Sequence, residues 1–171
     1  MLLIREETPK DHEEVRRVIR RAFENAEHTD HDEHNLVDRL RKSDAFIPEL
    51  SLVAETDGKI IGHVLFSKIR IQDTVQVALA PVSVLPELQG RGVGSALIRE
   101  GHARAAKMGY DFSVVLGHAA YYPRFGYVAA KTFGIRSPFP VPDENHMAVR
   151  LRGDVVALEG TVTYPKEFFE A

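Results

Sequence analysis

Hydrophobic positions along the chain follow two periods, one typical of helices and one typical of strands. Between residues 15 and 23 apolar side chains recur every three or four positions, which predicts the buried face of an amphipathic helix. Thr8 and Pro9 precede this stretch as a capping residue and a first-turn proline, so the helix is expected to begin just after them. A second, shorter helix with inward apolar side chains is expected around residues 36–40.

Two β-rich runs follow within residues 50–71, separated by Asp57-Gly58. This dipeptide is typical of a two-residue hairpin turn, so the runs are expected to pair as antiparallel strands. The next strand-like run, residues 75–85, contains Pro81. Because proline has no N–H to donate to a strand ladder, a bulge or a sheet edge is predicted there.

The second half of the chain mixes helix and strand signals. Helical spacing runs from Leu97 to Met108, and Gly109 is a helix stop signal. A short turn or helix is expected at residues 120–127, and further strands at residues 112–117, 146–151 and 161–165. The element order is β-α-α-β-β-β-α-β-α-β-β. It predicts an α+β fold with a mixed central sheet, in one domain covering residues 1–171.

Composition narrows the classes of partner. The 171 residues are 44% apolar and 27% charged, with a net charge of -3. This composition and charge favour neither a nucleic-acid nor a membrane partner. The chain has no apolar run long enough to span a bilayer, and its acidic start does not resemble a signal peptide, so a cytoplasmic location is expected. Cysteine is absent, which excludes disulfides, a thiolate nucleophile and cysteine metal ligands.

The segment "QGRGVGS", residues 89–95, lies between a predicted strand and a predicted helix. A helix that begins among these glycines leaves its first N–H groups unpaired beside the positive end of its dipole, and so forms a cradle for an anion such as phosphate. A turn without a ligand is the alternative interpretation. The ATP-type loop needs a lysine where Ser95 stands, and neither choice of first glycine gives the dinucleotide spacing G-x-G-x-x-G.

The longer segment "VSVLPELQGRGVGSALI" resembles the signature of the Gcn5-related N-acetyltransferases (GNAT), in which Q/R-x-x-G-x-G/A opens a helix after a strand. Gln89, Gly92 and Gly94 match its three specified positions. The resemblance implies a central mixed β-sheet of six to seven strands flanked by about four helices. "YYPRFGY" and "GTVTYP" resemble a bacterial subfamily of predicted acetyltransferases.

The resemblance also implies acetyl-CoA as cosubstrate and no metal. In the family, pantetheine runs beside the strand that precedes the signature, and the pyrophosphate rests on the signature backbone. A bulge at Pro81 would open the slot for pantetheine. The expected cofactor-binding residues are Val82, Ser83, Val84, Gln89, Gly90, Arg91, Gly92, Val93, Gly94 and Ser95.

The family reaction is a direct attack by an amine on the thioester, and the lack of cysteine excludes an acyl-cysteine intermediate here. The family pattern Y-x-x-x-G-F matches Tyr122 and Gly126, with Tyr127 in place of the last aromatic residue. Tyr122 is therefore expected to protonate the departing thiolate, and Tyr121 is a weaker candidate. The asparagine that many members place before this segment is missing, so His118 receives no role by resemblance.

No single general base is specified. Conceivable bases are Glu24, Glu27, His28, Glu55, His63 and His118, and a water chain is the alternative. The "HTDHDEH" segment, residues 28–34, resembles a metal-binding tract only weakly; a solvated loop that shapes substrate choice is preferred. The arginines of "RRVIRR", residues 16–21, are expected to form a solvated helix face.

The sequence thus predicts an N-acetyltransferase that moves an acetyl group to a primary amine. A non-catalytic acyl-CoA-binding sensor of the same fold is the main alternative. A second alternative is an enzyme that transfers a different acyl group bound in the same place. A nucleotide-binding protein is the least favoured alternative. The amine acceptor is unidentified, and the oligomeric state, a homodimer included, is left open.

Overall fold

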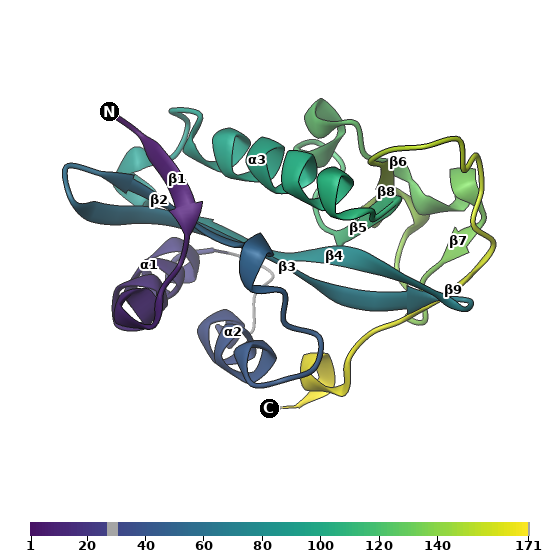
Figure 1. Ribbon diagram of the computed structural model, residues 1–171, viewed down its shortest axis with the longest axis horizontal. Coiled ribbons are helices and arrows are strands. Elements are labelled where there is room, and N and C mark those ends of the chain that lie inside the picture. Colours follow the sequence, from purple (N-terminus) through teal and green to yellow (C-terminus); the bar gives the residue numbers. More distant parts are fainter. Residues whose placement is uncertain (27–30, 171) are drawn as a thin grey trace.

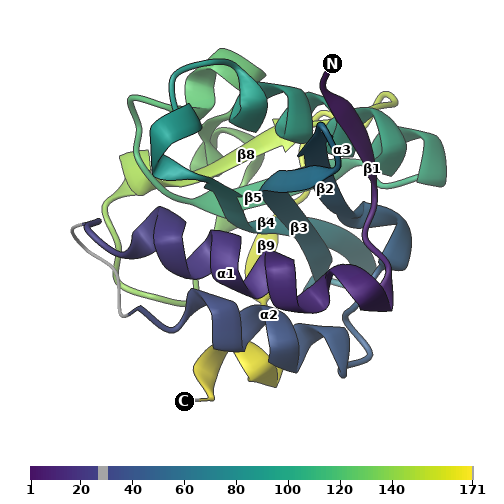
Figure 2. The same cartoon turned by 90° about the vertical axis from the view of Figure 1, so that its left-hand side faces the viewer.

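A twisted sheet separates two helical layers in the computed structural model, which describes residues 1–26 and 31–170 (Figure 1). The helices α1 and α2 cover one face and α3 covers the other, and Figure 2 shows α1 and α2 side by side. The helices are α1 (His12–Phe23), α2 (Glu33–Arg41) and α3 (Val93–Met108). The strands are β1 (Leu3–Glu6), β2 (Ser51–Thr56), β3 (Lys59–Ile71), β4 (Thr74–Val84), β5 (Phe112–Leu116), β6 (Val128–Ala129), β7 (Ile135–Arg136), β8 (His146–Arg150) and β9 (Gly160–Thr163).

The sheet has the mixed topology that the element order predicted. Its strand order is β1-β2-β3-β4-β5-β8-β6, with β9 pairing β3 and β7. The β4–β5 and β7–β9 pairs are parallel, and the other pairs are antiparallel. The expected α+β class is confirmed, but the described residues form nine strands rather than six to seven, partly because the count includes β6 and β7, which are only two residues long.

The described residues form three α-helices rather than about four. The segment expected as a turn or short helix is a 3₁₀ turn, Tyr122–Phe125, because Gly126 follows it in a left-handed conformation (φ 94°) and ends it. None of the helices described in residues 1–26 and 31–170 has both the length and the apolar character needed to cross a bilayer.

Local sequence signals account for several element boundaries. The N–H of Thr8 donates to Asp11 Oδ2 at 2.7 Å in a capping box just before α1. Asp57 and Gly58 have φ of 50° and 77°, and they form the predicted hairpin turn between β2 and β3. Gly109, with φ of 102°, ends α3 where the sequence indicated.

The predicted irregularity at Pro81 is a β-bulge. Val64 of β3 pairs with Val82, but Phe66 pairs with Leu79, so two residues of β4 oppose one residue of β3. Beyond Ala78, no ladder joins β4 to β5 in the part of the chain that the structure describes. The carboxyl half of β4 therefore presents an unpaired backbone edge toward β5.

Each face of the sheet buries its own apolar cluster. Under α3, a Cβ built on Gly101 would lie 2.2 Å from the ring of Phe66, so this glycine allows the helix to approach β3 closely. On the other face, α1 and α2 pack on β2 and β3 through a separate cluster: Val15, Val18, Ile19, Val37, Leu40, Ala45, Val53, Ile60 and Leu65. These two clusters hold α1 and α3 on opposite faces of the sheet.

Candidate active site

A cavity of about 530 Å³ lies where β4 ends and α3 begins. It contains eight of the ten residues expected to bind the cofactor, and Tyr122 also lines it. The lining residues are Val82, Val84, Leu88, Gln89, Gly90, Gly92, Val93, Gly94, Ser95, His118, Tyr121, Tyr122 and Arg124. The fold thus brings the glycine segment and the tyrosine segment, about thirty residues apart in the sequence, to one site.

The glycines shape the floor of this cavity. Gly90 and Gly92 have φ of 79° and 85°, a left-handed backbone that favours glycine. Gly94 lies inside the first turn of α3, and a Cβ there would stand 2.9 Å from Tyr121 Oη and 3.7 Å from Val84 Cγ2. The start of α3 therefore exposes backbone N–H groups to the cavity, which suits an anionic group.

Two of the expected cofactor residues do not line the cavity. Arg91 is exposed at its border. Ser83 is only 2% exposed, and its side chain points to the other face of the sheet because side chains alternate along a strand. Only the backbone of Ser83 is therefore available to a ligand at the unpaired β4 edge. Val82 and Val84 line the cavity and also pack against the core under α3.

The two tyrosines form the opposite wall. Tyr121 and Tyr122 meet edge to face, with ring centroids 5.1 Å apart. The ring of Tyr122 also lies 5.7 Å from that of Tyr127, whose hydroxyl contacts Ser113 Oγ at 2.8 Å. Burial raises the pKa of Tyr122 above its ordinary value, and the neighbouring Tyr121 adds to this rise. Tyr122 is therefore held in the protonated form that can donate a proton.

Arg124 and Leu88 are cavity residues that sequence reasoning missed. The guanidinium of Arg124 lies 4.7 Å from the ring centroid of Tyr121, and its Nε donates to the Tyr121 carbonyl at 3.0 Å. The nearby "YYPR" sequence was the available signal, since an arginine three residues after an aromatic side chain in a turn reaches back over it. His118 also lines the cavity and is exposed.

The remaining candidate bases lie in different surroundings. Glu55 accepts from Arg5 Nη2 at 2.8 Å and does not line the cavity. His63 is fully buried on the face of the sheet that carries α1. Glu24 lines the second cavity described below, while Glu27 and His28 lie outside the described residues.

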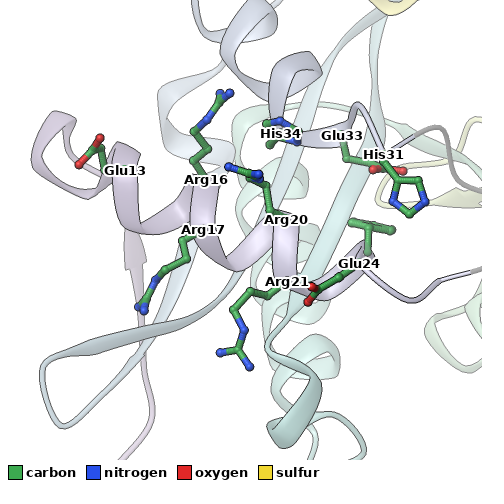
Figure 3. A pocket seen from close by; sticks show the side chains of 10 residues that line it. Glu13, Arg16, Arg17, Arg20, Arg21, Glu24, His31, Glu33 and His34 are labelled. Carbon is green, nitrogen blue, oxygen red and sulfur yellow. The ribbon is translucent and has the colours of Figure 1, made fainter.

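A second cavity, of about 640 Å³, lies between α1 and the start of α2 (Figure 3). Arg16 extends toward α2, and Arg17 and Arg21 extend to the opposite side of α1. Three of the arginines lie beside carboxylates: Arg16 beside Asp38, Arg17 beside Glu14 at 3.8 Å and Arg21 beside Glu87 at 2.7 Å. Glu13, Glu24 and Glu33 also line this cavity, so its lining has mixed charge. None of its described lining residues is a glycine, so it has no glycine cradle.

The histidine-rich segment contributes to this second cavity through His31 and His34. Among residues 1–26 and 31–170, no group of three or more histidine, aspartate or glutamate side chains is arranged to hold a metal ion. His28 and Asp30 of that segment lie outside the described residues.

Comparisons with known proteins agree with the fold and identify the family. Residues 48–129 match the model of the acetyltransferase (GNAT) domain. The uncharacterized N-acetyltransferase YjhQ of Escherichia coli K12 is 37% identical over 158 residues, which cover 90% of this chain and 84% of YjhQ. The uncharacterized N-acetyltransferase YhbS of the same organism is 34% identical, over 98% of both chains.

Two solved structures are similar over nearly the whole chain. A GNAT family acetyltransferase from Brucella melitensis, in complex with acetyl-CoA, has a TM-score of 0.82 and 35% identity over 98% of both chains. YhbS from Escherichia coli, in complex with CoA, has a TM-score of 0.89 and 32% identity over 99% of this chain and 92% of that one. The expected family is confirmed: this chain belongs to the GNAT acetyltransferases and is an N-acetyltransferase.

Proposed function

We propose that the protein transfers the acetyl group of acetyl-CoA to a primary amine by direct attack in a ternary complex, with residues 1–171 acting as one domain. One observation carries this proposal: a single cavity contains the end of the unpaired β4 edge, the glycine-rich start of α3 and the partly buried, hydroxyl-bearing ring of Tyr122. A thioester ligand with a phosphate-bearing tail needs these three features in one place.

The cavity residues suit acetyl-CoA. The backbone of residues 89–95 would hold the pyrophosphate, because the first N–H groups of α3 point there and Gly94 leaves room for close approach. The backbone of Val82, Ser83 and Val84 would pair with pantetheine, since this part of β4 has no β5 partner among the described residues. Similar proteins from Brucella melitensis and Escherichia coli bind acetyl-CoA and CoA, respectively. Bound acetyl-CoA supplies the activated acetyl group.

The residues of this chain then act on the reacting atoms. A backbone N–H of the β4 edge polarises the thioester carbonyl, and the neutral amine attacks the carbonyl carbon. A C–N bond forms and the C–S bond breaks. The attacking nitrogen loses one proton to water, and Tyr122 donates its hydroxyl proton to the departing thiolate. The raised pKa of Tyr122 keeps its phenol protonated, and so available as a donor, at neutral pH. Without cysteine, no acyl-cysteine intermediate can precede this step.

Tyr121 is the alternative acid. The Tyr121 hydroxyl lies beside Gly94 at the start of α3, where the pyrophosphate of acetyl-CoA is expected. The ring of Tyr122 lies deeper, against Gly117. This difference in depth favours Tyr122 for the thiolate and Tyr121 for contact with the cofactor. The acyl-CoA sensor would use the same cavity without turnover, and it differs from the enzyme in having no amine substrate.

Calorimetric titration with acetyl-CoA, CoA and ATP, side by side, tests the cofactor. We expect tight binding of acetyl-CoA and CoA and little heat from ATP. A panel of primary amines that includes a polyamine, a lysine peptide and an amino sugar then tests transfer through release of the CoA thiol. Binding without thiol release on any amine supports the sensor, and absence of acetyl-CoA binding overturns the proposal.

A further inference from the structure

Three segments of the chain meet at one buried oxygen atom behind the tyrosine wall of the cavity. Tyr127 Oη lies 3.0 Å from His102 Nε2 of α3 and 2.8 Å from Ser113 Oγ of β5. Ser113 is fully buried, Tyr127 is 1% exposed and His102 is partly buried. The proposed reaction assigns no role to these three side chains.

The number of available protons sets the direction of both hydrogen bonds. Tyr127 Oη is the one hydrogen-bond partner of Ser113 Oγ among the described residues, so a Ser113 proton that pointed elsewhere would be buried without an acceptor. Ser113 therefore donates to Tyr127. The single hydroxyl proton of Tyr127 then points to His102 Nε2, which accepts it, and the imidazole proton lies on Nδ1.

Both partners are in the protonation state that this arrangement needs. Burial raises the pKa of Tyr127, so its hydroxyl keeps the proton that it donates. Burial, and after it the nearby Arg99, lowers the pKa of His102 to about 4, so the imidazole is neutral at pH 7 and Nε2 has a free lone pair. Because His102 is partly exposed, water can accept from its Nδ1–H.

The two hydrogen bonds fix the far end of the Tyr127 ring. The hydroxyl oxygen lies on the long axis of the ring, and the backbone holds the other end of that axis. A donor on β5 and an acceptor on α3 therefore determine where the ring points, whereas a phenylalanine ring would be held by packing alone. The family pattern has phenylalanine at this position, so the hydroxyl of Tyr127 is a departure from it. Apolar side chains could fill the same volume, and a fully satisfied polar network adds a defined orientation.

The ring of Tyr127 in turn supports Tyr122. The two ring centroids lie 5.7 Å apart with 79° between the ring planes, which is an edge-to-face contact. Tyr122 also packs against Tyr121 and Gly117. Its hydroxyl has no hydrogen-bond partner in the part of the chain that the structure describes, so its position depends on the contacts of the ring. A displaced Tyr127 ring would therefore displace the Tyr122 hydroxyl.

The same oxygen atom connects Tyr122 to the cofactor cradle. His102 belongs to α3, whose first turn lines the cavity. Ser113 belongs to β5, the strand that leads to the tyrosine segment. The hydrogen bonds of Tyr127 thus join the helix that carries the cradle to the strand that precedes Tyr122, and they hold the two at a fixed spacing.

We propose that Tyr127 is a positioning residue for the acid: its hydroxyl accepts from Ser113, donates to His102 and so holds the ring against which Tyr122 stands. This inference rests on the proposed function, in which Tyr122 protonates the thiolate. Tyr127 does not line the cavity, so it acts through Tyr122. A misplacement of about 1 Å can cost on the order of 10²-fold in rate, which makes the fixed ring behind Tyr122 important for transfer.

NMR on the whole chain tests the positioning without an acceptor amine. We expect histidine ¹⁵N spectra to show His102 protonated at Nδ1, with Nε2 as the acceptor. With ¹³C-labelled tyrosine, the ring resonances of Tyr122 should shift in Tyr127→Phe and also in His102→Leu, although the ring contact of His102 is with Tyr127. A proton on Nε2, or Tyr122 resonances that do not respond to His102→Leu, overturns the inference.

The matched control is Tyr164→Phe. Tyr164 is another buried tyrosine, its hydroxyl has no hydrogen-bond partner among the described residues, and it packs in a different apolar cluster from Tyr122. Tyr164→Phe should leave the Tyr122 resonances and kcat unchanged. Equal shifts of the Tyr122 resonances in Tyr164→Phe and Tyr127→Phe would overturn the inference.

Kinetics with the best amine of the panel then test whether this position matters for transfer. We expect Tyr127→Phe and His102→Leu each to lower kcat about 10-fold, while the calorimetric Kd of acetyl-CoA stays within about 3-fold. His102→Gln retains an acceptor for the Tyr127 proton and should restore most of kcat. The Phe/Leu double variant should lose no more than the larger single loss, because both changes remove one support. Equal losses of kcat and acetyl-CoA affinity, or no rescue in His102→Gln, overturn the positioning role.

The two proposals can fail separately. Absence of turnover in the wild type, or a normal kcat in Tyr122→Phe, contradicts the proposed function, and the NMR measurement still decides what holds the Tyr122 ring. Turnover that depends on Tyr122 but is unaffected by Tyr127→Phe overturns the positioning role alone.

Discussion

The ring of Tyr122 packs directly on Gly117, the residue after β5: a Cβ built on this glycine would stand 2.3 Å from Tyr122 Cε2. The absence of a side chain at Gly117 thus allows the depth at which Tyr122 enters the cavity. We expect Gly117→Ala to displace the ring toward solvent and to lower kcat at least about 10-fold, with acetyl-CoA affinity changed much less. Steady-state kinetics and calorimetry on the same variant measure the two effects.

Removal of the Tyr122 hydroxyl tests the acid directly. Tyr122→Phe keeps the aromatic packing and removes the proton donor, so kcat should fall by about 10²–10⁴-fold while the Kd of acetyl-CoA stays within about 3-fold. Tyr121→Phe is the matched control and should weaken acetyl-CoA binding more than it lowers kcat. Equal losses of kcat and acetyl-CoA affinity in Tyr122→Phe would show that Tyr122 binds the cofactor or packs in the core, and does not act as the acid.

Two glycines of α3 should respond to the same substitution in opposite ways. Gly94→Ala places a methyl group in the cradle, so acetyl-CoA affinity should fall about 10-fold or more while the thermal stability of the free protein is retained. Gly101→Ala drives a methyl group into the Phe66 ring and should lower the free energy of unfolding by about 1–3 kcal/mol. Calorimetry and urea unfolding of both variants separate the two roles. The assignment fails if Gly94→Ala binds acetyl-CoA normally.

Buried histidines should make the protein acid-sensitive. Burial, and to a lesser extent Arg99, lowers the pKa of His102 from 6.5 to about 4 in the folded chain. Between pH 4 and pH 6.5 the unfolded chain binds more protons than the folded chain. The contribution of neutral His102 to the free energy of unfolding is therefore complete above pH 6.5 and is lost as the pH falls toward 4. His102→Gln should remove up to about 1.4 kcal/mol per pH unit from that slope. Urea unfolding at pH 7, 6 and 5 measures it, and an unchanged slope would contradict the prediction.

The ion pair of Glu7 and Arg41 gives a further prediction. Because both side chains are buried, Arg41→Met should leave an uncompensated carboxylate and cost about 3–5 kcal/mol of unfolding free energy. Glu7→Gln in the same chain should restore part of this loss, since it removes the isolated charge. Urea unfolding of the single and double variants tests the coupling, and a double variant no more stable than Arg41→Met would argue against it.

Local signals predicted much of this fold. Asp57-Gly58 located a turn, Gly109 located a helix end, and Pro81 located the bulge that opens β4, because each of these depends on backbone conformation or on a missing N–H. The glycine segment and Tyr122 were both recognised from short motifs, and the structure brings them to one cavity.

Long-range pairings could not be predicted in the same way. The sequence placed Ser83 with the cofactor residues but could not show that its side chain faces His63, because strand register is set by tertiary contacts. Glu7, Arg41, Ser51 and His63 meet only in the folded chain. Their spacing in the sequence follows no helical or strand period, so nothing in the pattern indicated that these four side chains would meet, although His63 was considered as a base.

The unpaired half of β4 also bears on how the protein avoids self-association. A strand with free backbone groups is usually dangerous at the rim of a sheet, where another polypeptide can dock along it and start an aggregate. Here the free edge lies in the middle of the sheet, with β3 on one side and β5, β8 and β6 beyond it on the other. A second polypeptide strand would have to force the parallel β4–β5 pair apart to reach it, whereas a slender, flexible chain can enter from the open end. The fold thus keeps its hydrogen-bonding groups available to a small molecule while it shields them from other copies of itself.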